Sequence, residues 1–135
     1  MATMPLARII VPPPSRGLDM AAGYGYPQST AVRAGDYVFV SGVVAIDPDS
    51  GERMNGTVTS EAHRVFRNLK LVLETAGSSL ERLVQVHAMI YDRIEYDALN
   101  RVYCQYVPNG PPARTVWSVQ IIDAFKLQLD AIAIV

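Results

Sequence analysis

The sequence predicts an α+β protein in which one β-sheet carries two helices on the same face. The 135 residues, of which 50% are hydrophobic and 19% charged, suit a single globular domain spanning 1–135. Only two stretches have the periodicity of a long helix, and strand-like runs surround them in the order βββ, α, β, α, ββ. Two helices interleaved with strands in this way favour a sheet covered on one face.

The first elements are short. Residues 1–6 are expected to be a loose start, and residues 7–11 form a β-branched run that three prolines at 12–14 bring to an end. Residues 15–29 are rich in Gly, Pro, Ala and Tyr, which predicts a long ordered loop. Long loops inside compact domains often carry function.

The strongest strand of the chain is predicted at residues 37–46, after a short strand at 30–33. Its nearly continuous apolar sequence, with β-branched and aromatic residues, is typical of a central strand covered on both faces. Gly42 within it predicts a bulge or a close backbone approach. The cluster of turn residues at 47–51 ends it.

The first long helix is expected to begin at Thr59 or Ser60, either of which is a good N-cap, and to run to about Ala76. Apolar residues recur along it at helical spacing and predict one buried face. His63 falls on the opposite side and is expected to be solvated. Gly77 is a C-terminal stop.

The second half of the chain alternates between strand and helix. Residues 83–91 predict a strand that holds His87 on a sheet face beside a local partner. No catalytic role is expected for His87, because nothing near it in sequence supplies a nucleophile or an orienting acid. A helix at 94–107, a strand opened by Arg114 and a final apolar strand at 126–135 complete the order.

Several of these strands are apolar on both faces. Because two helices cover only one face of a sheet, another copy of the chain is the natural cover for the second face. The pattern therefore predicts a homo-oligomer.

Composition excludes several classes of function. The net charge is −1 and the 12 basic residues are scattered, which is a poor footprint for nucleic acid or an acidic membrane. The single cysteine, Cys104, cannot form an internal disulfide. No apolar run has the length of a membrane span, and the N-terminus lacks the pattern of a secretory signal, so a soluble cytoplasmic protein is expected. No histidine, cysteine and carboxylate stand at metal-binding spacing, so no metal is expected.

Arg114 is the most distinctive polar residue. Pro111 and Pro112 fix the backbone just before it, and an apolar strand follows, so the guanidinium is well placed to hold an anion at a strand end. The alternative is an ordinary exposed arginine. Gln128 and Asp130, two residues apart on the last strand, share a sheet face, and Arg114 is one partner that they could have.

Several separate blocks, in the same order, resemble the RidA/YjgF/YER057c/UK114 family over roughly residues 31–135. The blocks are Ser41-Gly42, Asn68-Leu69-Lys70, Ala76 to Leu80, Asn100-Arg101-Val102-Tyr103, Pro111 to Thr115 and Ala131-Ile132-Ala133. The resemblance implies a chorismate-mutase-like fold, assembled as a trimeric barrel with active sites in the clefts between subunits. It also implies hydrolysis of reactive enamines and imines to a keto acid and ammonia, with no metal or organic cofactor.

The resemblance also implies roles for individual residues. Arg114 stands at the family arginine that binds the substrate carboxylate, as a guanidinium fork would. Backbone groups near Val116 and Gly42 line the same pocket, and Asn100 matches a family asparagine on the second helix.

The chain departs from the family pattern at three places. Gln128 stands where deaminating members carry a glutamate, and an amide can orient water but cannot take its proton. Asp130 matches a second acidic position and is a candidate substitute. In the loop, Gln28 stands at the family's tyrosine position, with Tyr24 or Tyr26 as a candidate replacement, and Val43 replaces a usual glutamine.

Three functions follow from this pattern. The first is a deaminase that acts on a carboxylate-bearing enamine or imine of the 2-aminoacrylate or 2-aminomuconate type, with Arg114 and Gln128 as catalytic candidates. The alternative is a non-catalytic trimer that binds a small carboxylate. The third, cleavage of nucleic acid, is disfavoured by the near-neutral charge.

Overall fold

A computed structural model describes residues 7–135, so the loose start predicted for 1–6 lies outside the described residues. The strands are β1 (Arg8–Val11), β2 (Ala31–Ala34), β3 (Tyr37–Val43), β4 (Leu83–Ile90), β5 (Ala113–Ser118) and β6 (Leu127–Ile134). The helices are α1 (Met20–Tyr24), α2 (Val58–Thr75) and α3 (Tyr96–Tyr106), with short 3-10 helices at Arg16–Leu18, Leu80–Arg82, Arg93–Glu95 and Ile122–Ala124.

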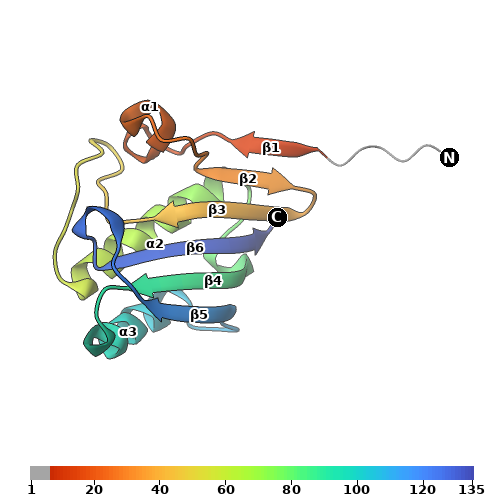
Figure 1. The fold of residues 1–135 in the computed structure, drawn as a ribbon. Coiled ribbons are helices and arrows are strands. Elements are labelled where there is room, and N and C mark those ends of the chain that lie inside the picture. The colour runs from red at the N-terminus through yellow and green to blue at the C-terminus, as the bar shows by residue number, and fades with distance from the viewer. Residues whose placement is uncertain (1–6) are drawn as a thin grey trace.

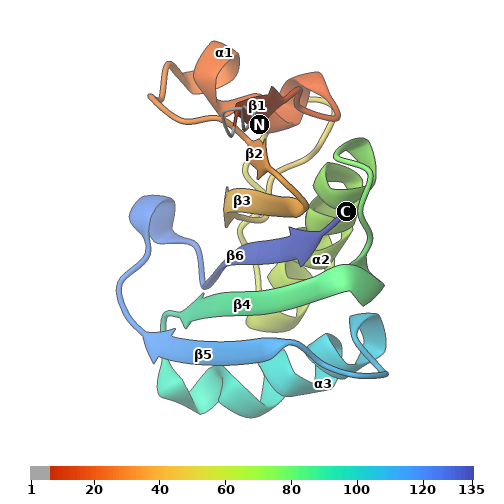
Figure 2. The ribbon, with the colours of Figure 1, turned by 90° about the vertical axis from the view of Figure 1, so that its right-hand side faces the viewer.

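Within the described residues the strands form one mixed sheet in the order β1-β2-β3-β6-β4-β5. All neighbours are antiparallel except β4 and β5, which are parallel and are joined through α3. The last strand, β6, lies in the middle of the sheet between β3 and β4. Both long helices lie on one side of the sheet, which confirms the predicted fold class (Figures 1 and 2).

The core lies between the sheet and these two helices. Alternate residues of β6 are buried toward the helices, beginning with Leu127 and Leu129, both 0% exposed. α2 contributes Phe66 and Leu69 from its apolar face, also 0% exposed. The helical and strand periodicities predicted from the sequence therefore meet in one core.

The start of α2 differs from the prediction. Its cap is Thr57, whose side chain accepts a hydrogen bond from the backbone N–H of Ser60 at 3.1 Å, so the cap expected at Thr59 or Ser60 is wrong. The predicted stop is confirmed. Gly77 has φ 83°, and the N–H of the next residue bonds back to the carbonyl of Leu73 at 2.8 Å, which closes the helix end in the left-handed conformation glycine favours.

The segment 15–29 is less irregular than predicted. It contains the 3-10 helix at Arg16–Leu18 and the five-residue helix α1. Asp19 caps α1 by accepting from the N–H of Ala22 at 3.0 Å, and Gly25 ends it with φ 68°. A single turn of helix is too short to leave a periodic signal, which is why the composition of this segment indicated a loop.

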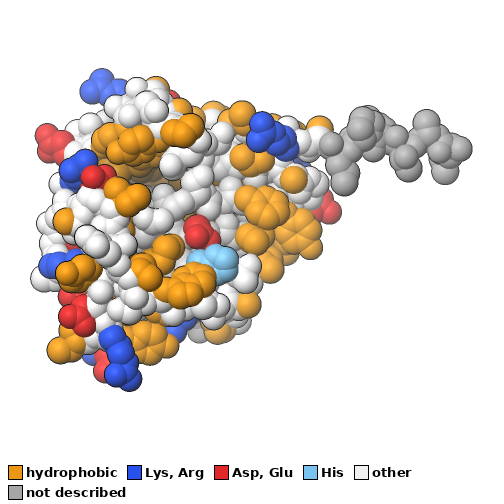
Figure 3. Space-filling model, in the orientation of Figure 1, with side chains coloured by type: hydrophobic (Ala, Val, Ile, Leu, Met, Phe, Trp, Pro, Cys, Tyr) orange, Lys and Arg blue, Asp and Glu red, His pale blue; other side chains and the backbone are white. Residues whose placement is uncertain are grey.

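The second face of the sheet carries no helix. Along β3, Val38 and Val40 are buried, while Tyr37 and Phe39 are 48% and 45% exposed, so within the chain only one face of this strand is covered. Figure 3 shows apolar side chains spread over this open face. The strand ends at Val43, three residues before its predicted end, and its register with β6 shifts between Val40 and Val43, which confirms a bulge at Gly42.

No helix within residues 7–135 combines the length and the apolar character needed to cross a membrane.

Candidate functional site

Arg114 is held by side chains of α3. Its Nη1 donates to Asn100 Oδ1 at 2.8 Å, and its Nη2 donates to the Tyr96 hydroxyl at 3.1 Å. Its guanidinium carbon lies 4.8 Å from the centroid of the Tyr103 ring, within cation–π range. Two of the five guanidinium N–H groups have these partners, which leaves donors for an anion.

This bracing follows from local sequence. Tyr96, Asn100 and Tyr103 are four and three residues apart, so they form one stripe on α3. A parallel β4–α3–β5 crossover brings that helix beside β5, and the stripe faces Arg114. The arginine predicted at a strand end is thus positioned by the helix that precedes it.

Tyr103 stays uncharged beneath the guanidinium. Burial raises the pKa of its phenol above the ordinary value, and the positive charge of Arg114 opposes part of that rise. The hydroxyl is buried, and among the described residues it has no hydrogen-bond partner. Tyr103 therefore presents a neutral aromatic face to Arg114.

A cleft of about 430 Å³ opens beside Arg114. Its lining residues come from β4, β5 and the start of α3, and they are Ile90, Arg93, Tyr96, Arg114, Val116 and Ser118. The predicted pair Arg114 and Val116 therefore share one cleft, with Asn100 bonded to the arginine. Arg93 adds a second guanidinium that the sequence did not single out.

A second group of predicted residues lies on the open face. A Cβ atom placed on Gly42 would stand 2.5 Å from Gln128 Nε2, so the glycine leaves room for the amide. Asp130, two residues along β6, shares that face and contacts His87 of β4, with Oδ1 2.9 Å from Nδ1.

The two groups lie on opposite faces of the sheet. Val86 of β4 pairs with Arg114 on one side and with Ala131 on the other, so these three side chains share the helix-covered face. Gln128 is three residues from Ala131 and therefore points to the other face. Within one chain Arg114 therefore does not partner Gln128 or Asp130, because Arg114 bonds to α3 and Asp130 to His87.

The loop candidates separate from one another. Gln28 lines a small cavity of about 20 Å³ that Ser41 and Gly42 also line. Tyr26 is 40% exposed, and its ring stacks on Tyr24 with the centroids 5.5 Å apart. The structure thus places Gln28 near Gly42 but does not place Tyr26 in that cavity.

The surroundings predicted for the two histidines are confirmed for His87 but not for His63. The local partner predicted for His87 is confirmed as Asp130, although the two residues are far apart in sequence. His63 is not simply solvated, because its Nδ1 lies 2.8 Å from the Tyr106 hydroxyl and its ring packs edge-on against that of Tyr106.

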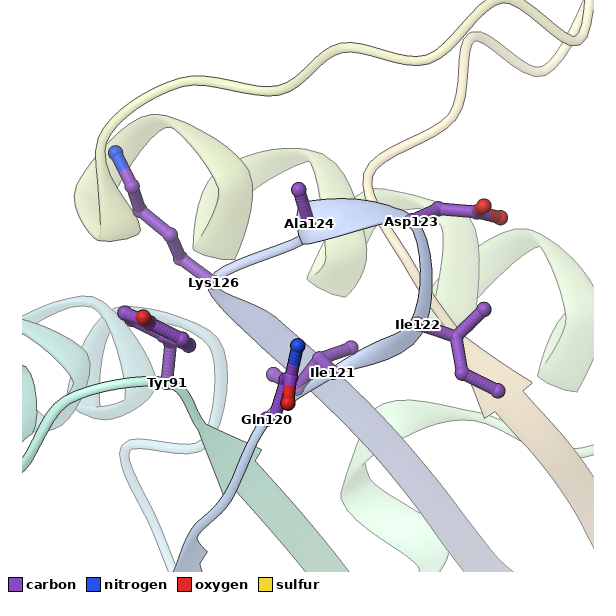
Figure 4. Close-up of a pocket in the computed structure, with 7 residues that line it drawn as sticks. All are labelled: Tyr91, Gln120, Ile121, Ile122, Asp123, Ala124 and Lys126. Atoms are coloured by element: carbon purple, nitrogen blue, oxygen red, sulfur yellow. The ribbon is translucent and has the colours of Figure 1, made fainter.

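A larger cavity of about 600 Å³ contains none of the predicted residues. Figure 4 shows its walls, formed by Tyr91 and by the connection from β5 to β6. In that connection Asp123 and Ala124 have φ 64° and 60°. The carboxylate of buried Glu61 fixes the end of the connection by accepting from the N–H of Lys126 at 2.9 Å.

Known proteins resemble this chain over most of its length. The sequence profile of the family described as Endoribonuclease L-PSP matches residues 19–135. A RutC family protein of Pyrococcus abyssi is 35% identical over 108 residues, covering 79% of this chain and 85% of the relative. The human 2-iminobutanoate/2-iminopropanoate deaminase is 28% identical over 109 residues, covering 80% of each chain.

Structural similarity agrees with the sequence similarity. The crystal structure of RidA from an Antarctic Psychrobacter species superimposes with a TM-score of 0.78 at 28% identity, covering 82% of this chain and 89% of that one. This protein therefore belongs to the RidA/YjgF/YER057c/UK114 family, which includes relatives named as imine deaminases.

Proposed function

We propose that this protein hydrolyses a reactive enamine or imine that carries a carboxylate, giving the keto acid and ammonia. The family supports this reaction class, since relatives are named as 2-iminobutanoate/2-iminopropanoate deaminases. Arg114 binds the carboxylate, backbone groups at Val116 and Gly42 border the substrate, and Gln128 orients the attacking water.

The observation that carries the proposal is the state of Arg114. It lines an open cleft, two of its N–H groups are used by neutral oxygens, and no carboxylate of residues 7–135 forms an ion pair with it. A guanidinium that is braced on one side and lacks a counter-ion on the other is suited to a bidentate carboxylate.

The site combines two copies of the chain. Arg114 and Gln128 lie on opposite faces of the sheet, so a substrate bound to one cannot reach the other within one chain. In a homotrimer, as the family resemblance implies, Arg114 of one copy meets Gly42 and Gln128 of the next. Each site is then formed by the edge strand β5 of one copy, which carries Arg114, and the open face of the next copy, which carries Gln128.

Arg93 favours a substrate with a second anionic group. It lines the same cleft as Arg114, and no carboxylate among the described residues pairs with it. Two guanidinium groups in one cleft suit a dicarboxylate of the 2-aminomuconate type better than 2-aminoacrylate. Gln28, Asn100 and Tyr26 remain candidates for further substrate contacts, with Asn100 acting through Arg114.

Gln128 supports one alternative, a trimer that binds a small carboxylate without turning it over. An amide cannot accept the proton of the attacking water, so a pocket with no other base would bind and not hydrolyse.

The test is ammonia release from 2-iminobutanoate or 2-aminoacrylate generated in solution, with wild type, Arg114→Ala and Arg114→Lys. We expect turnover by the wild type and a loss of at least about 100-fold in kcat/KM for Arg114→Ala, because two charge-assisted hydrogen bonds are removed. Arg114→Lys keeps the charge and should recover part of the loss. Gln128→Glu is the matched comparison, since activity in that variant alone would favour the binding alternative.

A further inference from the structure

The departure at Gln128 leaves the proposed reaction without an obvious base, and a histidine on the same face of the sheet meets that need. We propose that His87, oriented by Asp130, is the general base and acid of this protein. The inference rests on the proposed deaminase function.

The contact between the two side chains defines the protonation of the imidazole. His87 Nδ1 lies 2.9 Å from Asp130 Oδ1. A carboxylate only accepts hydrogen bonds, so Nδ1 carries the hydrogen and, in the neutral ring, Nε2 keeps a lone pair. Among residues 7–135, Nε2 has no hydrogen-bond partner, and it is free to accept a proton.

The ring is held in place from both sides. β4 pairs His87 with Asp130 of β6 and with Thr115 of β5. The Trp117 ring meets the imidazole edge-on, with centroids 5.2 Å apart. An orienting acid and an aromatic wall fix the direction of Nε2, as a base needs.

His87 and Asp130 lie near Gln128, which can orient the attacking water but cannot take its proton. Gln128 pairs with Met89 and Asp130 pairs with His87, so Gln128 and His87 are diagonal neighbours on one face, about 7–8 Å apart between Cα atoms. In the single chain the side chains of the pair are 33% and 39% exposed, so the chain itself does not bury them.

The surroundings place few other charges against the imidazole. Asp130 faces it from β6, where Gln128 is neutral. From β5 it is faced by Thr115 and Trp117, which do not titrate at ordinary pH. In Figure 3 a histidine side chain, in pale blue, touches an acidic side chain, in red, near the middle of the open face. The atoms around them are apolar or uncharged. Asp130 is therefore the group that stabilises an imidazolium there.

The proton balance of the reaction closes with these groups. As the water oxygen bonds to the imine carbon, the C=N π pair moves to nitrogen and the water gives one proton to Nε2. The imidazolium returns that proton to the nitrogen and forms an amino alcohol. Its hydroxyl proton then passes through Nε2 to the nitrogen, the C–N bond breaks, and the keto acid and ammonia leave. His87 ends as it began.

The experiment uses the fact that the sequence contains two histidines. Ammonia release and its pH profile are measured for wild type, His87→Gln, Asp130→Asn and the matched control His63→Gln. His87→Gln should lower kcat by at least about 100-fold and remove the acid limb of the wild-type pH profile, because the base is gone. His63→Gln should keep the wild-type rate and profile.

Two further readouts separate catalysis from structure. Binding of 2-oxobutanoate by calorimetry should be unchanged in His87→Gln, because Arg114 holds the carboxylate. Imidazole ¹⁵N spectra should show the Nδ1–H form in wild type and lose that preference in Asp130→Asn. A wild-type rate and acid limb in His87→Gln, or an Nε2–H form in wild type, would overturn the role of His87 while leaving the deaminase intact. A wild type inactive on every imine would overturn the proposed function itself, and this role with it.

Discussion

The two faces of the sheet differ in burial, although the strands place alternate residues on each of them. The helix-covered face is complete within one chain, with Phe66 of α2 packed at 0% exposure and stacked on Tyr106 at 5.0 Å. The open face leaves Phe39 45% exposed and carries the polar pair His87 and Asp130. The closed core therefore lies on one face, while exposed apolar side chains and the polar pair lie on the other.

Paired aromatic substitutions test this contrast most strongly. Phe66→Ala should destabilise the chain by about 3–5 kcal/mol, because it leaves a cavity in a closed core. Phe39→Ala should cost less than about 1 kcal/mol in the free energy of unfolding of the single chain, because nearly half of the side chain is already exposed. Chemical denaturation measures both. Phe39→Ala should also weaken self-association by analytical ultracentrifugation, and equal losses of stability would contradict the contrast.

Gly42→Ala gives the next largest effect and acts on the open face alone. The added methyl group would stand 2.5 Å from Gln128 Nε2, and this flexible amide can move aside. We expect about a 10-fold loss in ammonia release with little change in melting temperature, because water positioning changes and the core does not. Gly23→Ala is the control, since nothing lies within 4 Å of its Cβ position. Activity equal to wild type in Gly42→Ala would argue against a role for Gln128.

Tyr103→Phe should give the smallest effect. Removing a buried hydroxyl that has no partner among the described residues should leave stability unchanged or raise it by up to about 1 kcal/mol. Tyr106→Phe, which removes the hydrogen-bond partner of His63, should instead lower the stability.

The pH dependence of stability checks the same tyrosine. Burial raises the pKa of Tyr103 in the folded state above 10.0, so the folded chain holds this proton more tightly than the unfolded chain. Its contribution is fully present below pH 10 and is lost as the pH rises through the folded value. Tyr103→Phe should lack that alkaline loss, and identical alkaline profiles for the two proteins would contradict the burial effect.

Sequence patterns predicted most of this fold because each helix, strand and turn depends mainly on residues close together in the sequence. The stop at Gly77 and the bulge at Gly42 could be predicted from a single residue each. Gly77 has the left-handed φ that glycine favours, and at Gly42 a Cβ would crowd Gln128. The start of α2 was misplaced because Thr57, Thr59 and Ser60 are all good caps, and only the structure distinguishes them.

The site was harder to predict because its contacts join distant residues. Arg114 could be predicted from its own setting, and the helical spacing of Tyr96, Asn100 and Tyr103, which contact it, is a signal present in the sequence. The contact between His87 and Asp130 depends on which strands are neighbours and in what register. Residue types and spacing do not contain that information, so the sequence alone shows no acid beside His87.

The position of β6 has a consequence for how the chain is made. All the strands that flank it precede it in the sequence, so during synthesis β3 and β4 wait as separate edges, with exposed backbone N–H and C=O groups, until residues 127–134 emerge from the ribosome. The pairing of β6 with β3 closes a loop of most of the chain, which is an entropically late step. The nascent protein is therefore most exposed to aggregation just before its last strand is inserted, when a chaperone would help it most.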